Sequence, residues 1–175
     1  MLRVLLCLAL AVLPSWAGRP ATPFEAARIS VQAYGEDAGL PSNRVHAVLL
    51  DRRGQLWAGT QEGLAYFGGR GWTLMALPGG APSLYVRALA ETSDGALWVG
   101  TQDGGLWRYR GGQWRHFAGE RELPAHRVNA LRVTREGDRD ILWVGMGGGG
   151  LVRLDGEQVT RIAEVQEPWI WCLEE

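Results

Sequence analysis

A repeated unit constrains how this chain can fold more than any other feature. Its three copies open with Val45, Val86 and Val128, and a fourth opens with Ile170 near the end of the 175 residues. The openings are spaced 41, 42 and 42 residues apart, a regularity that chance does not give. Units of this length cannot bury an apolar face alone, so they stack on their neighbours to form a continuous core.

Each copy has the pattern of four short antiparallel strands. Apolar and polar residues alternate with a period of two, and turn-forming pairs such as Arg53-Gly54 and Glu62-Gly63 separate the alternating runs. In the first copy the expected strands are Val45 to Leu50, Leu56 to Thr60, Leu64 to Phe67 and Trp72 to Leu77. Four strands in about 40–45 residues make one β-propeller blade. We therefore predict an all-β chain, a β-propeller of four-stranded antiparallel blades.

The predicted propeller occupies residues 29–175 and is an incomplete ring. Segment 29–34 resembles an outermost strand without a blade of its own, because Val31 precedes Val45 by the same 14 residues that separate Trp72 from Val86. Propellers commonly close by lending such a strand to the final blade. Rings of this type take about four to eight blades, so we expect this chain to be the N-terminal part of a longer protein. The expected units are the closing strand 29–34, the blades 45–77, 86–117 and 128–162, and the start of the next blade at 170–175.

Three positions of the repeat are expected to serve packing. The second strand of each blade carries Leu-Trp-x-Gly, and an identical Trp in every blade is typical of packing between blades rather than of ligand contact. The glycine lets neighbouring backbones approach closely, and a threonine hydroxyl after it can tie the next turn. The residues concerned are Trp57, Trp98, Trp143, Gly59, Gly100, Gly145, Thr60 and Thr101.

Residues 145–150 also fit G-x-G-x-x-G, the pattern of a dinucleotide-binding loop. In the register of the repeat, the first two residues of Gly147–Gly150 replace Gln102 and Asp103, which form a turn between two strands. A strand is expected after this turn, whereas a phosphate-binding loop needs a helix N-terminus there. We therefore predict a β-turn and no nucleotide site. Four consecutive glycines make it the least constrained and most mobile turn of the three blades.

Residues 1–17 have the pattern of a secretory signal peptide. Arg3 supplies a positive charge, an apolar run covers 4–13, and small residues stand at the spacing of a cleavage site. An uncleaved membrane anchor is the alternative, but this run is shorter than the roughly 20 residues that span a bilayer. Residues 18–28 then form a short N-terminal linker. After cleavage Cys172 is the remaining cysteine, so no internal disulfide is expected.

The charged residues do not indicate a nucleic-acid partner. All 18 basic residues are Arg, and 19 acids bring the net charge to -1. The arginines are scattered among the acids and form no basic block, which nucleic-acid binding would require.

Catalytic and metal-binding patterns are weak. His46, His116 and His126 lack the short-range pairs of a zinc site and are expected at the surface or in strand packing. No serine lies in G-x-S-x-G, and the acids of 136–140 only loosely resemble a calcium loop. We expect no cofactor, no metal and no catalytic residue in this chain.

Within residues 29–175 the motifs G-L-P-x-N-x-V, D-x-x-G-x-L-W-x-G-T and G-L resemble the two-component regulator propeller repeat. Three departures stand out. Thr92 occupies the position of Asp51, Met146 replaces the threonine, and the third copy carries a three-residue insertion around 138–140 that we expect to lengthen its first turn.

The resemblance implies the periplasmic sensor region of a bacterial membrane receptor, a hybrid histidine kinase or a diguanylate cyclase. Signal output by phosphorelay or cyclase activity would then belong to later domains, and this chain would not be an enzyme. The implied partners are an unknown small molecule or oligosaccharide ligand, the remaining blades of the full-length protein and a possible second copy in a homodimer. The alternative is a secreted or periplasmic binding or scaffolding propeller that is not coupled to a kinase.

Ligand contacts are expected where the blades differ, because the conserved pattern of the repeat is occupied by packing. The residue just before each opening apolar position varies, and arginine suits carboxylate or sulfate groups while aromatic rings suit sugar faces. The alternative is that these side chains only cover the propeller rim. The candidate ligand-binding residues are Arg44, Tyr85, Arg127 and Trp169.

Overall fold

The computed structural model describes residues 32–78, 84–118 and 123–174. Contacts divide the chain after Gln32, and the description below concerns the second unit, Ala33–Glu175. The predicted signal peptide and linker, and residues 29–31 of the predicted closing strand, lie outside the described residues. No helix in the described part is long and apolar enough to cross a membrane.

Three separate four-stranded antiparallel sheets make up the described unit, each ordered as its strands follow along the chain. A 3-10 turn, η1 (Glu36–Ala38), precedes the first sheet. Blade 1 contains β1 (Val45–Leu50), β2 (Leu56–Thr60), β3 (Gly63–Phe67) and β4 (Trp72–Met75). Blade 2 contains β5 (Val86–Glu91), β6 (Leu97–Thr101), β7 (Leu106–Arg110) and β8 (Gln113–Phe117). Blade 3 contains β9 (Val128–Glu136), β10 (Arg139–Met146), β11 (Leu151–Asp155) and β12 (Gln158–Arg161).

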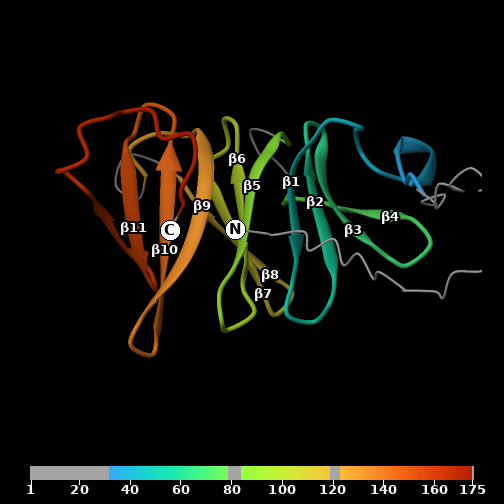
Figure 1. Cartoon of the computed structure of the whole chain (residues 1–175), viewed down its shortest axis with the longest axis horizontal. Coiled ribbons are helices and arrows are strands. Elements are labelled where there is room, and N and C mark those ends of the chain that lie inside the picture. The colour runs from blue at the N-terminus through green and yellow to red at the C-terminus, as the bar shows by residue number, and fades with distance from the viewer. Residues whose placement is uncertain (1–31, 79–83, 119–122, 175) are drawn as a thin grey trace, which may run out of the picture. The chain divides into compact units, whose positions relative to one another are not determined.

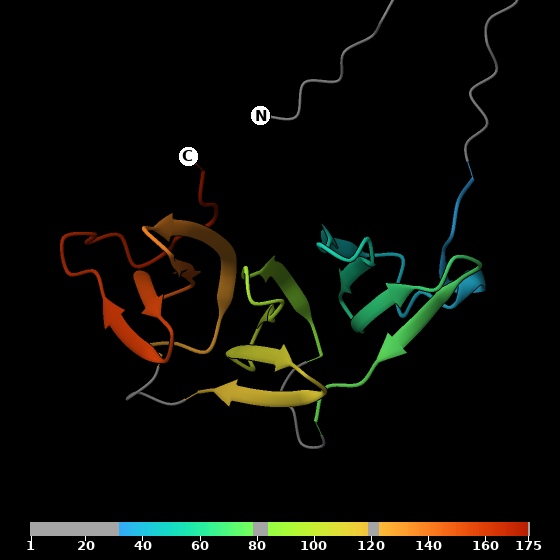
Figure 2. The ribbon, with the colours of Figure 1, turned by 90° about the horizontal axis from the view of Figure 1, so that it is seen from below.

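This arrangement confirms the predicted fold class. The sheets lie side by side in chain order, with the first strand of each blade toward the same side (Figures 1 and 2). The prediction of a longer first turn in blade 3 was wrong. The insertion instead extends the hairpin, because Arg139 pairs with Glu136 across a tight turn and the two strands grow to 9 and 8 residues.

The repeat glycines receive the opening residue of the next blade. A Cβ built on Gly59 would lie 2.5 Å from Val86 Cγ1, and one on Gly100 would lie 2.4 Å from Val128 Cγ1. Gly145 stands in the same relation to Ile170, at 2.7 Å from its Cγ2. Hydrogen alone fits at these positions, so the glycines set how closely successive blades approach.

Hydrophobic cores fill the space between successive blades. Trp57 packs with Val86 and Val99 between blades 1 and 2, and Trp98 packs with Leu142 between blades 2 and 3. Fully burying such an apolar side chain contributes roughly 1.5–3 kcal/mol. Trp143 of blade 3 is only half-buried in the described part of the chain.

The threonines after the repeat glycines organise the following turns. Thr60 Oγ1 donates to the carbonyl of Gly63, and Thr101 Oγ1 donates to that of Gly105, both at 2.9 Å. Each hydroxyl also accepts a backbone N–H from inside its turn. These are the hydrogen bonds expected from the sequence.

The glycine-rich turn at Gly147–Gly150 leads directly into β11, as predicted for a turn and not for a phosphate-binding loop. Its backbone is tied to the residues that follow blade 3. The N–H groups of Gly148 and Gly150 both donate to the carbonyl of Pro168, at 2.8 and 3.0 Å, and Gly147 forms a bridge with Trp169.

Both ends of the described unit contact a blade without forming a strand. At the N-terminal end, the Tyr34 carbonyl accepts a 2.9 Å hydrogen bond from Trp72 Nε1. At the other end, Ile170 N–H donates to the Met146 carbonyl at 2.9 Å. Whether these segments complete other blades stays a prediction.

Candidate functional site

Every blade carries a β-bulge at the start of its first strand. The pairing register slips after the opening valine, so one extra residue is inserted before pairing resumes. Bulges of this kind re-aim a side chain and are common beside functional sites. The inserted residues are His46, Arg87 and Asn129, and Trp171 holds the same position after Ile170.

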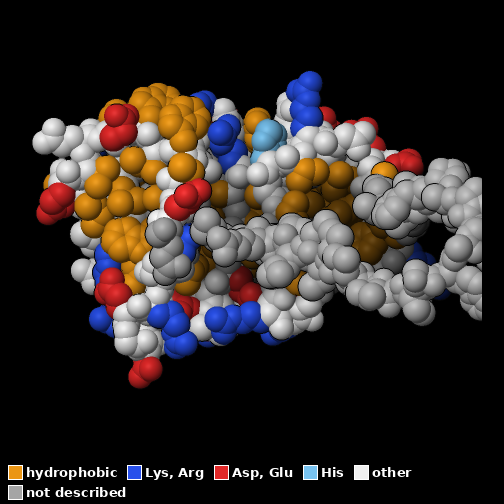
Figure 3. Space-filling view, viewed as in Figure 1, with side chains coloured by type: hydrophobic (Ala, Val, Ile, Leu, Met, Phe, Trp, Pro, Cys, Tyr) orange, Lys and Arg blue, Asp and Glu red, His pale blue; other side chains and the backbone are white. Residues whose placement is uncertain are grey.

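The candidate residues predicted from the sequence lie one position before the opening residue, so they flank the same bulges. We call this row the bulge edge. It consists of Arg44, His46, Tyr85, Arg87, Arg127, Asn129, Trp169 and Trp171. Figure 3 shows arginine and histidine side chains among hydrophobic ones along the upper edge, where β10 ends and β9 begins (Figure 1).

Four of these residues form a cationic cluster between blades 1 and 2: Arg44, His46, Tyr85 and Arg87. The His46 ring lies 4.6 Å from the Tyr85 ring, and the Arg87 guanidinium carbon lies 5.7 Å from the same ring. Blade 1 therefore supplies two of the side chains and blade 2 the other two.

Two glutamines hold the arginines of this cluster in place. Arg44 Nη1 donates to Gln61 Oε1 at 2.9 Å, and Arg87 Nη1 donates to Gln102 Oε1 at 2.7 Å. Each glutamine oxygen accepts a hydrogen bond from an arginine. Because the glutamine side chain is uncharged, it orients the guanidinium group without neutralising its charge. Among the described residues, no carboxylate lies within 4.0 Å of either guanidinium.

The local field of the cluster is positive. Burial lowers the pKa of His46 below its usual 6.5, and the nearby charges of Arg87 and Arg44 lower it further. Like charges disfavour the protonated imidazole. His46 is therefore neutral at pH 7, and the positive charge of the cluster comes from the two guanidinium groups.

A second group of bulge-edge residues gathers at the end of blade 3. Arg127 lies 4.0 Å from Asp103 and 5.8 Å from the centre of the Trp169 ring, which stacks on Trp171 at 5.8 Å. Asn129 donates to the Ile170 carbonyl at 3.0 Å, while its Oδ1 is buried and has no hydrogen-bond partner. This second group therefore differs from the cationic cluster, because it contains two stacked tryptophans and its arginine has an acidic partner.

The structure thus brings the sequence-predicted residues together as two pairs along one edge. Arg44 joins Tyr85 through His46, and Arg127 joins Trp169. Ligand binding by these residues stays a prediction. Sequence reasoning missed Arg87 and Asn129 and assigned His46 to the surface or to strand packing. The residue after each opening position also differs between repeats, and that variation was the available signal.

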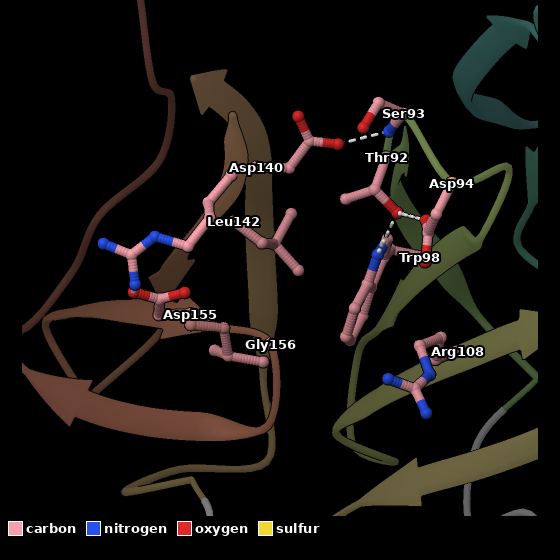
Figure 4. A pocket seen from close by; sticks show the side chains of 11 residues that line it. Thr92, Ser93, Asp94, Trp98, Arg108, Asp140, Leu142, Asp155 and Gly156 are labelled. Carbon is pink, nitrogen blue, oxygen red and sulfur yellow. Dashed lines mark hydrogen bonds and ion pairs between the residues drawn. The ribbon is translucent and has the colours of Figure 1, made fainter. Parts of the chain in front are cut away.

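A cleft of about 290 Å³ lies between blades 2 and 3. Trp98 and Leu142 line it with apolar surface (Figure 4), and so does Leu154. Its charged side chains already have protein partners: Asp94 with Arg110, Arg108 with Glu157, Arg139 with Asp155, and Asp140 with Ser93 N–H and Arg135. The cleft therefore has no charge free for a ligand.

Within the described ranges, no three His, Cys, Asp or Glu side chains lie close enough to hold a metal ion. Arginine, glutamine and aromatic groups dominate the bulge edge. Such a set is suited to binding anions or rings and not to holding divalent cations.

Three consecutive four-stranded blades define this chain as part of a β-propeller. Segments 39–62 and 80–103 match the two-component regulator propeller. The chain therefore carries two-component regulator propeller repeats, as its motifs predicted. A comparison with curated proteins found no match.

Solved structures support the same fold. The chain is similar to the extracellular domain of BT3049 from B. thetaiotaomicron, described as a hybrid two-component system, with 21% identity and a TM-score of 0.69 over 80% of this chain and 22% of that one. Two structures of the extracellular domain of BT4673 from the same organism, described once as a one-component and once as a hybrid two-component system, match at 23% identity. Their TM-scores are 0.61 and 0.62, over 77% of this chain and 19% of theirs. The chain thus spans about a fifth of the length of these structures.

Proposed function

We propose that this chain is the N-terminal part of the periplasmic ligand-sensing propeller of a bacterial membrane receptor, a sensor histidine kinase or diguanylate cyclase. The observation that carries the proposal is the two-component regulator propeller repeat, which matches segments of blades 1 and 2 in a row of three four-stranded blades. It is supported by the similar structures, which are extracellular domains of signalling systems, and by the leader-like residues 1–17. We assign no catalytic activity to this chain, since kinase or cyclase chemistry would belong to later domains.

The bulge edge suits sensing because it crosses blade boundaries. A ligand that bridges Arg44 of blade 1 and Arg87 of blade 2 contacts two units whose packing is fixed separately by Gly59 and Val86. Such a ligand would favour one relative arrangement of the blades. Signalling then requires that the ligand bind one receptor state more tightly than another, since only differential affinity shifts an equilibrium. A second receptor copy would be a natural partner for passing the change across the membrane.

Export can be tested with alkaline phosphatase, which becomes active only outside the reducing cytoplasm. The phosphatase is fused after residue 174, with and without residues 1–17. We expect activity from the fusion that keeps these residues and none from the other. Equal activity of both fusions, or none from either, would overturn the periplasmic assignment.

Coupling to a receptor is tested with the complete protein encoded by the gene. Fractionation should place it in the inner membrane, and its phosphorylation or cyclic-dinucleotide output should change with an added ligand. A protein recovered wholly in the soluble periplasmic fraction would instead favour the alternative, a binding or scaffolding propeller without a kinase.

A further inference from the structure

We propose that the cationic cluster of Arg44, His46, Tyr85 and Arg87 is a binding site for the carboxylate group of a small organic acid or acidic sugar. The inference rests on the proposed sensor function and names a ligand class for it. The evidence is the charge, the geometry and the position of these four side chains.

No acid of the described residues forms an ion pair with the two arginines of this cluster. The 18 arginines and 19 acids nearly balance, and arginines elsewhere, such as Arg139 and Arg153, pair with carboxylates at 2.7 Å. Arg44 and Arg87 contact glutamine oxygens instead. Two guanidinium groups near one histidine, without a described acid, leave a positive charge that a ligand anion can neutralise.

Each arginine of the cluster uses one Nη1 on a glutamine and keeps further N–H groups that can donate to an anion. A guanidinium binds a carboxylate side-on through two parallel N–H groups. In Arg87, Nη1 is used by Gln102, while Nε is buried from solvent and has no acceptor in the structure. Arg87 Nε is therefore a donor without a protein acceptor beside the cluster. A buried unpaired donor is unfavourable, so a movement of the Arg87 side chain that brings Nε against a ligand oxygen would be favoured.

The surrounding side chains explain why an anion is preferred over a neutral ring. The Tyr85 ring has His46 close to it and Arg87 over it, which leaves less aromatic surface for a sugar face. Neutral His46 can donate one N–H or accept one hydrogen bond, and an added anion would favour its protonated form. A carboxylate placed beside His46 would lie in the field of both Arg44 and Arg87, because both charges act on that ring.

Isothermal titration of the whole chain with galacturonate and citrate, at low ionic strength, tests the proposal. Galactose is the matched neutral sugar, and sulfate is the matched inorganic anion. We expect both carboxylates to bind, galactose not to bind, and sulfate to bind at least tenfold more weakly than either acid. Added salt should weaken the binding, since exposed charges are screened.

Variants locate the site. Arg44→Gln and Arg87→Gln should each weaken carboxylate binding at least tenfold, with circular dichroism spectra unchanged. Arg70→Gln removes the same charge from an exposed turn of blade 1 and should leave binding unchanged. No binding of either acid, equal losses in all three variants, or sulfate binding as tight as the acids would each overturn the proposal. If the acids fail to bind but the complete receptor responds to another ligand, only the carboxylate site is overturned and the sensor function stands.

Discussion

The indole N–H of Trp98 donates a 3.2 Å hydrogen bond to the hydroxyl of Thr92. The same relation recurs in each blade, with Trp57 donating to Asp51 Oδ2 at 3.0 Å and Trp143 donating to Thr134 Oγ1 at 2.9 Å. The acceptor always lies six residues after the opening valine. Blade 2 therefore has an acceptor for the indole N–H at the same position as blade 1, but the acceptor is the Thr92 hydroxyl in place of the Asp51 carboxylate.

Replacing Thr92 with valine should destabilise the chain by about 1–3 kcal/mol, the usual cost of leaving a buried donor unpaired. Trp98 is only 4% exposed, so water cannot replace the lost acceptor. Thr134→Val is the matched control, because half-buried Trp143 can be hydrated and should lose less than about 1 kcal/mol. Urea unfolding of both variants measures the difference. Equal losses would show that burial of the indole does not decide the cost.

Gly100→Ala should destabilise by about 1–3 kcal/mol, because the added methyl group would overlap Val128 of the next blade. Gly68→Ala is the control, since its nearest heavy atom would be 3.7 Å away. The double variant with Val128→Ala should recover part of the loss, and a double-mutant cycle reports the coupling. Strictly additive effects would contradict close packing between Gly100 and Val128.

The sequence predicted the blades because their turns and period-two alternation are local. Strand β2 begins at Leu56 and ends at Thr60 as expected, while β4 ends at Met75 and leaves buried Leu77 beyond the strand. Strand ends depend on packing against the next blade, and one repeat viewed alone does not show that packing. The sequence predicted that Gly100 allows close packing. It did not identify Val128 as the neighbour, because that contact depends on how the blades stack.

The candidate site was predicted less completely than the fold. Arg44 and Tyr85 were identified because they vary between repeats, yet the bulge that adds His46 and Arg87 to the same edge depends on the pairing register. A strict period-two pattern along the strand does not allow for the inserted residue, so it assigns the side chains near the bulge to the wrong face of the sheet. The orientation of Arg87 by Gln102 likewise depends on a contact across 15 residues of chain.

Acid should weaken the fold in part through Asp51. Burial raises the pKa of this carboxyl, but hydrogen bonds from Trp57, Gln55 and Arg53 outweigh burial and bring it below the usual 3.8. A pKa lowered by folding contributes stability that is present above the unfolded value and is lost as pH falls through the folded one. The free energy of unfolding should therefore decrease as pH falls below about 4–5.

Asp51→Asn tests this contribution, because it removes the ionisable group at that position and retains an acceptor oxygen. Unfolding by urea between pH 3 and pH 6 should show a shallower pH dependence for the variant than for the parent chain. Asp37→Asn, in exposed η1, serves as a control and should leave the slope unchanged. Identical slopes for all three chains would refute the assignment to Asp51.

A carboxylate from each following blade caps the first turn of the blade before it. Glu91 of blade 2 accepts the backbone N–H of Arg52 at 2.8 Å, and Asp140 of blade 3 accepts that of Ser93 (Figure 4). Blade 3 has Val133 at the position of Glu91. The insertion therefore supplies an acid that the repeat position itself lacks.

Asp140→Ala should destabilise the chain by about 1–2 kcal/mol, within the range for hydrogen bonds to charged groups. Without Asp140 the exposed Ser93 N–H has only water as an acceptor. Asp138→Ala changes an exposed acid of the same insertion and should be neutral within about 0.5 kcal/mol. Hydrogen exchange gives the decisive measurement, because the Ser93 amide should lose protection in Asp140→Ala alone. Unchanged protection there would mean that the insertion does not join blades 2 and 3 through this contact.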